Sequence, residues 1–331
     1  MAVDDIKKRT GEPKDFGKLV LELIWLSVIT LPLILWAIIQ KFKTPHRKSL
    51  RGEVVLITGA GNGLGREVAI EMAEKGCRLA LVDINEEWVN NVTQEINKKH
   101  KDVAKSYVAN LGQPVAIKKI SEQIIADFGR VDLLINNAGI IYGGISLLEF
   151  KDQELDAVFQ VNVMSQFRMI REFLGGMLER NHGHIVSISS CSSYVGLANA
   201  SVYTSTKWAL NGMMETLREE LRAIPDNQVK ISICCPYFIS TSPLYTEQWD
   251  LRIPPLSVSE AAVAVIDGIE KEEDQFSIPP HMYMLLNLIK LFPNNLKDVI
   301  TSIFYTRVLP TTESVRKASP IAKQLEIDHG K

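Results

Sequence analysis

The sequence has no excess of charge of either sign, no patterned cysteines and no internal repeat. Its 37 basic and 39 acidic side chains give a formal net charge of -2, so no basic field is available to a nucleic acid. The four cysteines (Cys77, Cys191, Cys234 and Cys235) have neither the spacing of zinc ligands nor that of a disulfide framework. We therefore expect no metal, no nucleic-acid partner, and buried free thiols that suit a reducing compartment.

Residues 19–39 form a long apolar run in which Glu22 is the only charged residue. As a helix this run spans roughly 30 Å, the thickness of the hydrocarbon core of a bilayer. Pro32 near its middle allows either a kinked spanning helix or a hairpin that enters and leaves on one side. A buried core helix is the alternative. We predict a membrane anchor over residues 19–40, between a polar tail (1–18) and a basic linker (41–51).

Beyond the linker, short apolar runs rich in β-branched residues alternate with segments of helical periodicity. Strands separated by helices of a dozen or more residues indicate βαβ units and a parallel sheet. We predict an α/β domain over residues 52–280, with a single Rossmann-type, doubly wound parallel sheet. The expected strands are 53–58, 78–83, 104–109, 131–135, 184–189 and 229–235. The expected helices are 63–75, one ending at 99, 114–128, 152–180, 203–223, and one that a capping box at 257–260 opens.

Residues 281–331 form a C-terminal extension that opens with an almost wholly apolar segment, 282–292. Five apolar residues then recur at the i, i+3, i+4, i+7 and i+8 spacing of one helical face: Leu296, Val299, Ile300, Ile303 and Phe304. Two interpretations stay open. This amphipathic helix packs on the α/β domain, or it lies on the same membrane as the N-terminal segment.

A glycine-rich loop, 58–65, joins the first expected strand to the helix that follows it. Such a loop allows a tight turn, the close approach of a pyrophosphate and the packing of helix on strand. Free N–H groups at the start of the helix attract the pyrophosphate. The cofactor-binding residues expected in this loop are Gly59, Asn62, Gly63, Leu64 and Gly65.

Asp83 ends the second expected strand, at about the 20-residue distance from the glycine loop where a ribose-binding carboxylate is found. A carboxylate there accepts hydrogen bonds from the adenosine ribose and repels a 2′-phosphate. Ile84 follows it, and the loop holds no Arg or Lys before Arg66. We therefore predict NAD as the cofactor in preference to NADP. A strand-end turn residue is the alternative role for Asp83.

Tyr203 and Lys207 are four residues apart in an expected helix, which places them on one face. Oxidising an alcohol requires its hydroxyl proton to leave, and a free tyrosine, with a pKa of about 10, is a poor base at neutral pH. We expect the lysine ammonium to lower the pKa of Tyr203 and so make it a general acid–base. An ordinary helix pair is the alternative for these two residues taken alone.

Five spaced motifs together make the sequence similar to the short-chain dehydrogenase/reductase family over residues 52–280. They are TGxxxGxG at 58–65, Asn-Asn-Ala-Gly at 136–139, Asn162, Ser190 and the pair Tyr203 and Lys207. The resemblance implies that Ser190 holds the substrate oxygen, that Lys207 also holds the nicotinamide ribose, and that Asn162 supports a water relay to Lys207. Ser190 is preferred to Ser189 and Ser192 because its spacing to the tyrosine matches the family's.

The resemblance also implies further cofactor contacts. They are Asn110 at the adenine, Asn137, Ala138 and Gly139 along the adenosine, and Pro236 and Thr241 at the nicotinamide. Two of these positions differ from the family. Asn110 replaces its usual aspartate, and Tyr237 follows Pro236 where the family has glycine, so the backbone loses its freest position there.

The apolar N-terminal segment, the Pro-Tyr at 236–237 and the apolar extension resemble the membrane-associated retinol and 17β-hydroxysteroid dehydrogenases of this family. That branch implies a retinoid, sterol or long-chain alcohol substrate, and a homodimer on the endoplasmic reticulum or lipid droplets, with its catalytic domain facing the cytosol. Tyr142 and Tyr237 are the candidate substrate contacts beside Ser190 and Tyr203. Two alternatives stay open: an NADPH-linked carbonyl reductase, and a non-catalytic membrane or lipid-droplet scaffold.

Overall fold

The computed structural model describes residues 16–41, 46–141, 143–241, 246, 248–304 and 306–310. The chain divides into two compact units, Met1–Arg47 and Lys48–Lys331. Within the first, helix α2 (Phe16–Lys41) runs without a break through Pro32, so no hairpin turn forms at that residue. Its segment Gly17–Trp36 is long and apolar enough to cross a membrane, and none of it is buried.

The second unit is built on a seven-stranded parallel sheet with the strand order β3-β2-β1-β4-β5-β6-β8. Its strands are β1 (Val54–Thr58), β2 (Arg78–Asp83), β3 (Ala104–Val108), β4 (Leu133–Asn136), β5 (His184–Ile188), β6 (Lys230–Pro236) and β8 (Gln275–Ile278). Every residue of β1, β4 and β5 is buried, which is why their sequences are mostly apolar and do not alternate between polar and apolar residues.

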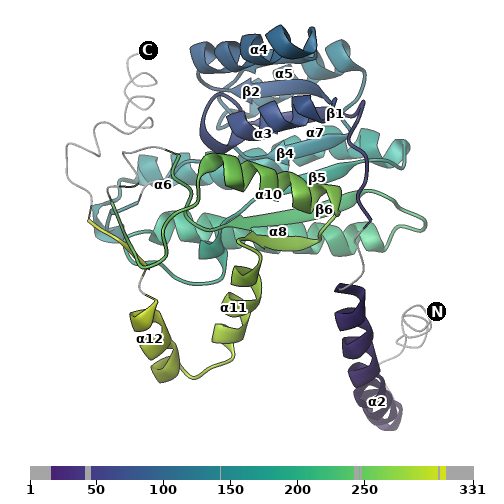
Figure 1. Cartoon of the computed structure of the whole chain (residues 1–331), viewed down its shortest axis with the longest axis vertical. Coiled ribbons are helices and arrows are strands. Elements are labelled where there is room, and N and C mark those ends of the chain that lie inside the picture. Colours follow the sequence, from purple (N-terminus) through teal and green to yellow (C-terminus); the bar gives the residue numbers. More distant parts are fainter. Residues whose placement is uncertain are drawn as a thin grey trace. The chain divides into compact units, whose positions relative to one another are not determined.

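Helices cover both faces of the sheet and make three layers (Figure 1). One core cluster joins the sheet to α3 (Gly63–Glu74), α4 (Glu86–His100) and α10 (Val258–Glu270). The other joins it to α5 (Pro114–Phe128), α7 (Ser165–Glu179) and α8 (Ser201–Arg222). This arrangement confirms the predicted doubly wound α/β fold. The strand order reverses between β1 and β4, and ligands of such sheets bind beyond the carboxyl ends of the strands at that point.

The predicted helix 152–180 is interrupted. It is made of α6 (Asp152–Phe159), a π-helical turn η2 (Gln160–Met164) and α7. Asn162 lies within the π turn and is fully buried. A single π turn inside an α-helix is rare and is often found at functional sites, because it re-aims the backbone and side chains locally.

After β8 the chain forms α11 (His281–Lys290) and α12 (Asn294–Ile303), and then strand β9 (Thr306–Val308). Strand β9 pairs antiparallel with β7 (Trp249–Leu251), a pairing that the sequence analysis did not predict. The predicted amphipathic helix is α12, and it differs from α11 in burial. Helix α11 packs on the domain through Met282, Leu286 and Ile289, whereas α12 buries no residue.

Candidate active site

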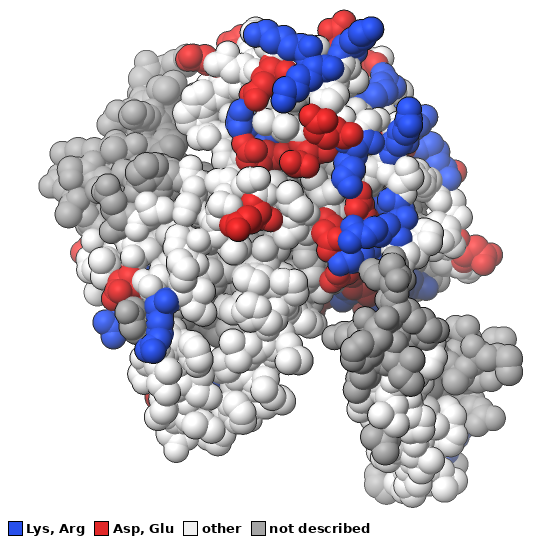
Figure 2. All heavy atoms as spheres, in the orientation of Figure 1, with Lys and Arg blue, Asp and Glu red and all other residues white. Residues whose placement is uncertain are grey.

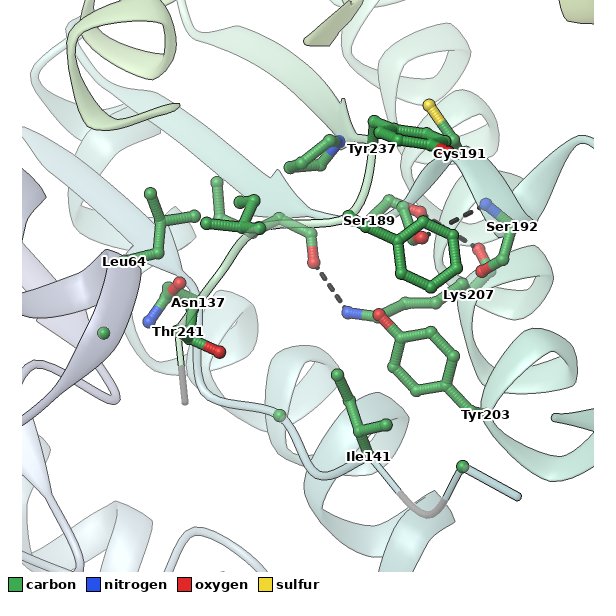
Figure 3. Close-up of a pocket in the computed structure, with 18 of the residues that line it drawn as sticks. Leu64, Asn137, Ile141, Ser189, Cys191, Ser192, Tyr203, Lys207, Tyr237 and Thr241 are labelled. Carbon is green, nitrogen blue, oxygen red and sulfur yellow. Dashed lines mark hydrogen bonds between the residues drawn. The ribbon is translucent and has the colours of Figure 1, made fainter. Parts of the chain in front are cut away.

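A cavity of about 370 Å³ lies at the carboxyl ends of β1, β4, β5 and β6. Loops that follow these strands supply most of its lining, as expected for the point where the strand order reverses. Figure 3 shows side chains from the glycine loop and from α8 facing this space. Among the described residues, no group of three or more His, Cys, Asp or Glu side chains could hold a metal ion.

The loops after β1 and β4 are fastened to each other at one end of the cavity. Asn137 Nδ2 donates to the carbonyls of Thr58 (3.0 Å) and Gly59 (3.1 Å). The backbone N–H groups of Asn137 and Ala138 both donate to Thr58 Oγ1, each at 3.0 Å. Although Asn137 lines the cavity, its amide group holds the glycine loop in place. The two motifs, far apart in sequence, are therefore one structural unit.

Three glycines of the loop have too little space around them for a side chain. Gly59 has φ +65°, and a Cβ there would lie 2.9 Å from Ala138 Cα. Gly63 has φ +55° at the start of α3, and a Cβ would meet Thr241 Cγ2 at 3.3 Å. A Cβ at Gly65 would lie 2.0 Å from the Gly59 carbonyl oxygen. These residues fit a pyrophosphate at the N-terminus of α3, with Asn62, Leu64 and Thr241 also lining the cavity.

Asp83 lines the cavity from the end of β2. Its Oδ2 accepts a hydrogen bond from the Gly61 N–H (2.8 Å), and its Oδ1 accepts one from the Asn85 N–H (3.0 Å). A carboxylate has about four lone-pair sites, so two remain for a ribose diol. Asn110 is not among the lining residues; its Oδ1 accepts the Gly112 N–H at 2.9 Å.

The other end of the cavity holds three of the predicted catalytic residues. Tyr203 and Lys207 project from the first turns of α8, and Lys207 Nζ lies 5.5 Å from the centre of the Tyr203 ring. Figure 3 shows these two side chains next to each other. Lys207 Nζ donates to the Ile188 carbonyl (2.8 Å), which fixes the amine against the end of β5. Ser190 forms a hydrogen bond with the Tyr203 hydroxyl.

The neighbouring serines are distinguished by what their hydroxyls contact. Ser189 Oγ donates to Asn211 Oδ1 on α8 (2.7 Å). Ser190 Oγ accepts the Ser192 N–H (3.1 Å) and lies beside Tyr203. Of these two, Ser190 is therefore the one whose hydroxyl can share a substrate oxygen with the tyrosine.

Asn162 does not line the cavity, and its side chain binds the backbone beside it. Its Oδ1 accepts the Ile140 N–H (2.6 Å), while its Nδ2 donates to the Ile140 carbonyl (2.9 Å) and to Thr206 Oγ1 (3.1 Å). Both amide hydrogens are thus used. Asn162 positions the loop after β4 against α8. Its Oδ1 keeps a second lone pair, and the water relay to Lys207 stays a prediction.

Burial sets the protonation of the catalytic pair. It raises the pKa of Tyr203 to about 12, although the hydrogen bond with Ser190 acts in the opposite direction. Burial also lowers the pKa of Lys207 to about 8. The pKa of Tyr203 is therefore raised and not lowered as predicted, because the desolvation of a phenolate is the largest effect on it. With its pKa raised, the Tyr203 hydroxyl keeps its proton at neutral pH.

Apolar side chains surround the catalytic group. They are Ile141, Leu197, Ala200, Tyr237, Phe238, Trp249 and Val308. Tyr237 donates its hydroxyl to the Ile253 carbonyl (3.3 Å), so the predicted substrate contact presents a ring and not a free hydroxyl. Edge-on contacts link Tyr237 to Phe238 (5.1 Å) and Phe238 to Trp249 (4.8 Å). Tyr142, the other predicted contact, lies outside the described residues.

Sequence reasoning missed Ile141, Leu197 and Val308, which carry no motif. Val308 reaches the cavity because β9 is fastened on both sides. The Asn199 side chain donates to the Val308 carbonyl (2.9 Å), and the Leu309 N–H donates to the Gln248 carbonyl (2.8 Å). The C-terminal extension therefore forms part of the cavity wall.

Comparison with known proteins identifies the family. The family model described as short chain dehydrogenase matches residues 53–250. This chain is a short-chain dehydrogenase/reductase. It is 32% identical over 283 residues to human 17-beta-hydroxysteroid dehydrogenase 13, covering 85% of this chain and 93% of that relative. It is 36% identical over 253 residues to bovine short-chain dehydrogenase/reductase family 16C member 6, covering 76% and 79%.

Solved structures of other short-chain dehydrogenases have the same fold. One from Burkholderia phymatum in complex with NAD has a TM-score of 0.65 at 24% identity, covering 73% of this chain and 94% of that one. A metagenomic short-chain oxidoreductase in complex with NADP has a TM-score of 0.59 at 30% identity, covering 69% and 94%. The predicted family is thus confirmed, and this short-chain dehydrogenase is an oxidoreductase that uses a nicotinamide cofactor. One of these structures holds NAD and the other NADP, so they do not establish which of the two cofactors this chain uses.

The buried Lys207 of this short-chain dehydrogenase should cost stability. We expect Lys207→Met to abolish activity and yet raise the melting temperature at pH 7. The pKa of Lys207 falls from 10.5 to about 8 on folding, so the unfolded state binds more protons between these values and wild-type stability rises with pH across that window. The gain from the substitution is at most on the order of 3 kcal/mol below pH 8, and the lost bond to Ile188 offsets part of it.

Thermal unfolding of the detergent-solubilised variant and wild type at pH 7 and pH 10.5 measures this effect. The advantage of the variant should shrink toward the higher pH, where the wild-type lysine is neutral in the fold. An equal difference at both pH values would show that Lys207 has an ordinary pKa.

Proposed function

We propose that this dehydrogenase oxidises a lipophilic primary or secondary alcohol, such as a retinoid, sterol or long-chain alcohol, with NAD. One observation carries the proposal. A single cavity has Asp83 at one end, and at the other Ser190, Tyr203 and Lys207 surrounded by apolar walls. Among the described residues, those walls offer a polar substrate no partner, and burying its polar groups there would cost free energy. The names of the similar hydroxysteroid dehydrogenases point in the same direction.

Each end of the cavity has a separate task in this proposal. The glycine loop and Asp83 would hold the pyrophosphate and the adenosine ribose, and Lys207 the nicotinamide ribose. When bound, the oxidised nicotinamide accepts the hydride and brings a positive charge. Ser190 and Tyr203 hold the substrate oxygen, and Tyr203 exchanges its proton at the phenol oxygen. Because burial raises the pKa of Tyr203, a nearby positive charge is what would let it act as a base.

The proposed setting is the endoplasmic reticulum membrane, the surface of a lipid droplet, or both, with the catalytic domain facing the cytosol. Helix α2 supports it, since Gly17–Trp36 can cross a bilayer.

The proposal includes a homodimer. The exposed Phe159, Met164 and Phe167 along α6, η2 and α7 support it, because one helical rod presents all three to solvent. The mass of the detergent-solubilised protein tests it.

A second candidate is an NADPH-linked carbonyl reductase with the same site. The proton-donating Tyr203 favours reduction, since a carbonyl oxygen must gain a proton. Asp83 opposes this candidate, because its carboxylate repels a 2′-phosphate. Tyr203 thus favours the reductase and Asp83 the NAD-linked dehydrogenase, so the cofactor preference of the protein decides between them.

A substrate panel tests the proposal. Full-length protein in detergent is incubated with NAD and all-trans-retinol, estradiol, dodecanol or propan-2-ol, and NADH absorbance is followed. Each buried CH₂ contributes about 0.8 kcal/mol, so kcat/KM for the best lipophilic alcohol should exceed that for propan-2-ol by at least about 100-fold. Comparable values for all four alcohols would contradict an apolar substrate site. Turnover that requires NADPH and a ketone would support the reductase.

A further inference from the structure

Helix α11 has apolar side chains on two opposite faces. One face, with Met282, Leu286 and Ile289, is buried against the domain. On the other face, Met284 is 70% exposed, and Leu291, just past the end of the helix, is 78% exposed. A soluble surface helix ordinarily has a polar outer face. An apolar outer face indicates that something other than water covers it.

The outward direction of that face is fixed by aromatic contacts on the inner side. Tyr283 packs edge-on against Tyr194, with ring centres 5.8 Å apart. Lys290 Nζ lies 4.9 Å from the ring centre of Tyr194 and 4.7 Å from that of Trp208. Cation–π and aromatic contacts of this kind each contribute roughly 0.5–2 kcal/mol. The exposed face of α11 is therefore held in place by the fold.

The exposed apolar surface of α11 continues on helix α12. None of its residues is buried. Val299 within the helix is 54% exposed, and Phe304, just past its end, is 50% exposed. A helix of this length is marginal in water unless one face packs against something. At its C-terminal end, Arg252 Nη1 donates to the Ile303 carbonyl (3.0 Å), which fastens the helix to the domain. Its apolar stripe nevertheless stays about half exposed, with Leu296 at 42% and Ile303 at 48%.

On the face that Figure 2 shows, the lobe made by α11 and α12 carries almost no charged side chain, whereas charged groups crowd over the far end of the domain. Over residues 281–304, the Lys, Arg, Asp and Glu residues are Lys290, Lys297 and Asp298, which sum to one positive charge. An exposed apolar surface of this extent marks an interaction site.

We propose that α11 and α12 together dock into a lipid leaflet, as a second membrane contact besides α2. The aliphatic outer faces offer almost no hydrogen-bonding or charged pattern with which to recognise a protein partner. The slight positive charge suits lipid headgroups. The choice of lipid rests on the proposed function, because α2 would bring a bilayer to the chain. Only residues 42–47 separate α2 from Lys48, where the catalytic unit begins, and six residues span at most about 20 Å.

The docking surface is followed in the chain by β9, which lines the cavity. Phe304 follows the last residue of α12, and Thr306 opens β9. Val308 on β9 and its pairing partner Trp249 both line the cavity. An alcohol dissolved in the leaflet would thus meet the apolar end of the cavity beside α12. We infer that the substrate is delivered from lipid at this edge.

Site-selective quenching tests the docking without relying on catalysis. All four native cysteines are buried, and burial raises the pKa of each thiol, so they should not react with a maleimide fluorophore. Leu291→Cys and Val299→Cys place a label on the proposed surface. Val115→Cys on α5, which is 81% exposed, is the matched control. Each full-length variant is reconstituted into phosphatidylcholine vesicles that contain doxyl-labelled phosphatidylcholine as a lipid-phase quencher.

Quenching by the doxyl lipid should be at least about threefold stronger at positions 291 and 299 than at 115, and quenching by aqueous iodide should show the reverse order. Iodide quenching at 299 equal to that at 115 would overturn the proposal. Protection from both quenchers would also overturn it, because a protein surface would then cover the helices. If the protein were quenched by the doxyl lipid but turned over no substrate, the proposed function would be refuted and the membrane docking would stand.

Discussion

Tyr203→Phe is expected to lower kcat by about 10³-fold, within the range that general acid–base catalysis contributes. The substitution keeps the ring over which Lys207 lies and removes only the hydroxyl that bonds to Ser190. The fold and the cofactor contacts should therefore survive, and the loss should fall on the chemical step. Steady-state kinetics with the best alcohol of the panel, together with NADH binding by fluorescence, separate these effects.

Two further variants calibrate that result. Tyr283→Phe makes the same chemical change on α11, outside the cavity lining, and should leave kcat within about twofold because no reacting group is lost. Ser190→Ala should cost about 10²-fold, as expected when one hydrogen-bond donor to the developing charge is removed. If Tyr203→Phe retained wild-type kcat, the phenol would not be the acid–base. If the wild type bound NADH but turned over nothing, the scaffold alternative would be favoured.

The cofactor end of the site was predictable because its parts are local and fall at fixed points of a parallel sheet. The glycine loop follows β1, Asp83 ends β2, and Ala138 follows β4, so the topology alone brings them together. The sequence did not show how they are joined. Asn137 matched a cofactor motif, yet its side chain binds the carbonyls of Thr58 and Gly59.

The substrate end was not predictable for the opposite reason. Strands β7 and β9 are three residues each, too short for a period-two pattern, and they pair across more than 50 residues of sequence. The π turn at Asn162 likewise has no signature in a helical pattern. The protonation of Tyr203 was mispredicted because helical spacing gives the distance to Lys207 but not the depth of burial, and burial has the larger effect here.

Exchanging Asp83 and Ile84 for Asn and Arg is expected to shift the ratio of kcat/KM for NADP over NAD by about 10²–10³-fold toward NADP. The carboxylate faces the cavity, where a bound 2′-phosphate would lie within a few ångströms of it. Two like charges about 4 Å apart near a protein surface repel by roughly 4 kcal/mol, which corresponds to a factor on the order of 10³. Ile84 is exposed, so an arginine can be accommodated there and can pair with the phosphate.

Asp83→Asn alone is the control for the loop itself. The amide has nearly the same shape and can still accept one of the two N–H groups, from Gly61 and Asn85, that the carboxylate accepts. This variant should therefore lose NAD affinity with a small change in melting temperature, whereas a collapse of stability would mean that Asp83 serves mainly to hold the glycine loop. A wild type that already prefers NADP would contradict the assignment of Asp83 to the ribose. An unchanged ratio in the double variant would contradict it as well, since the charge that discriminates would then lie elsewhere.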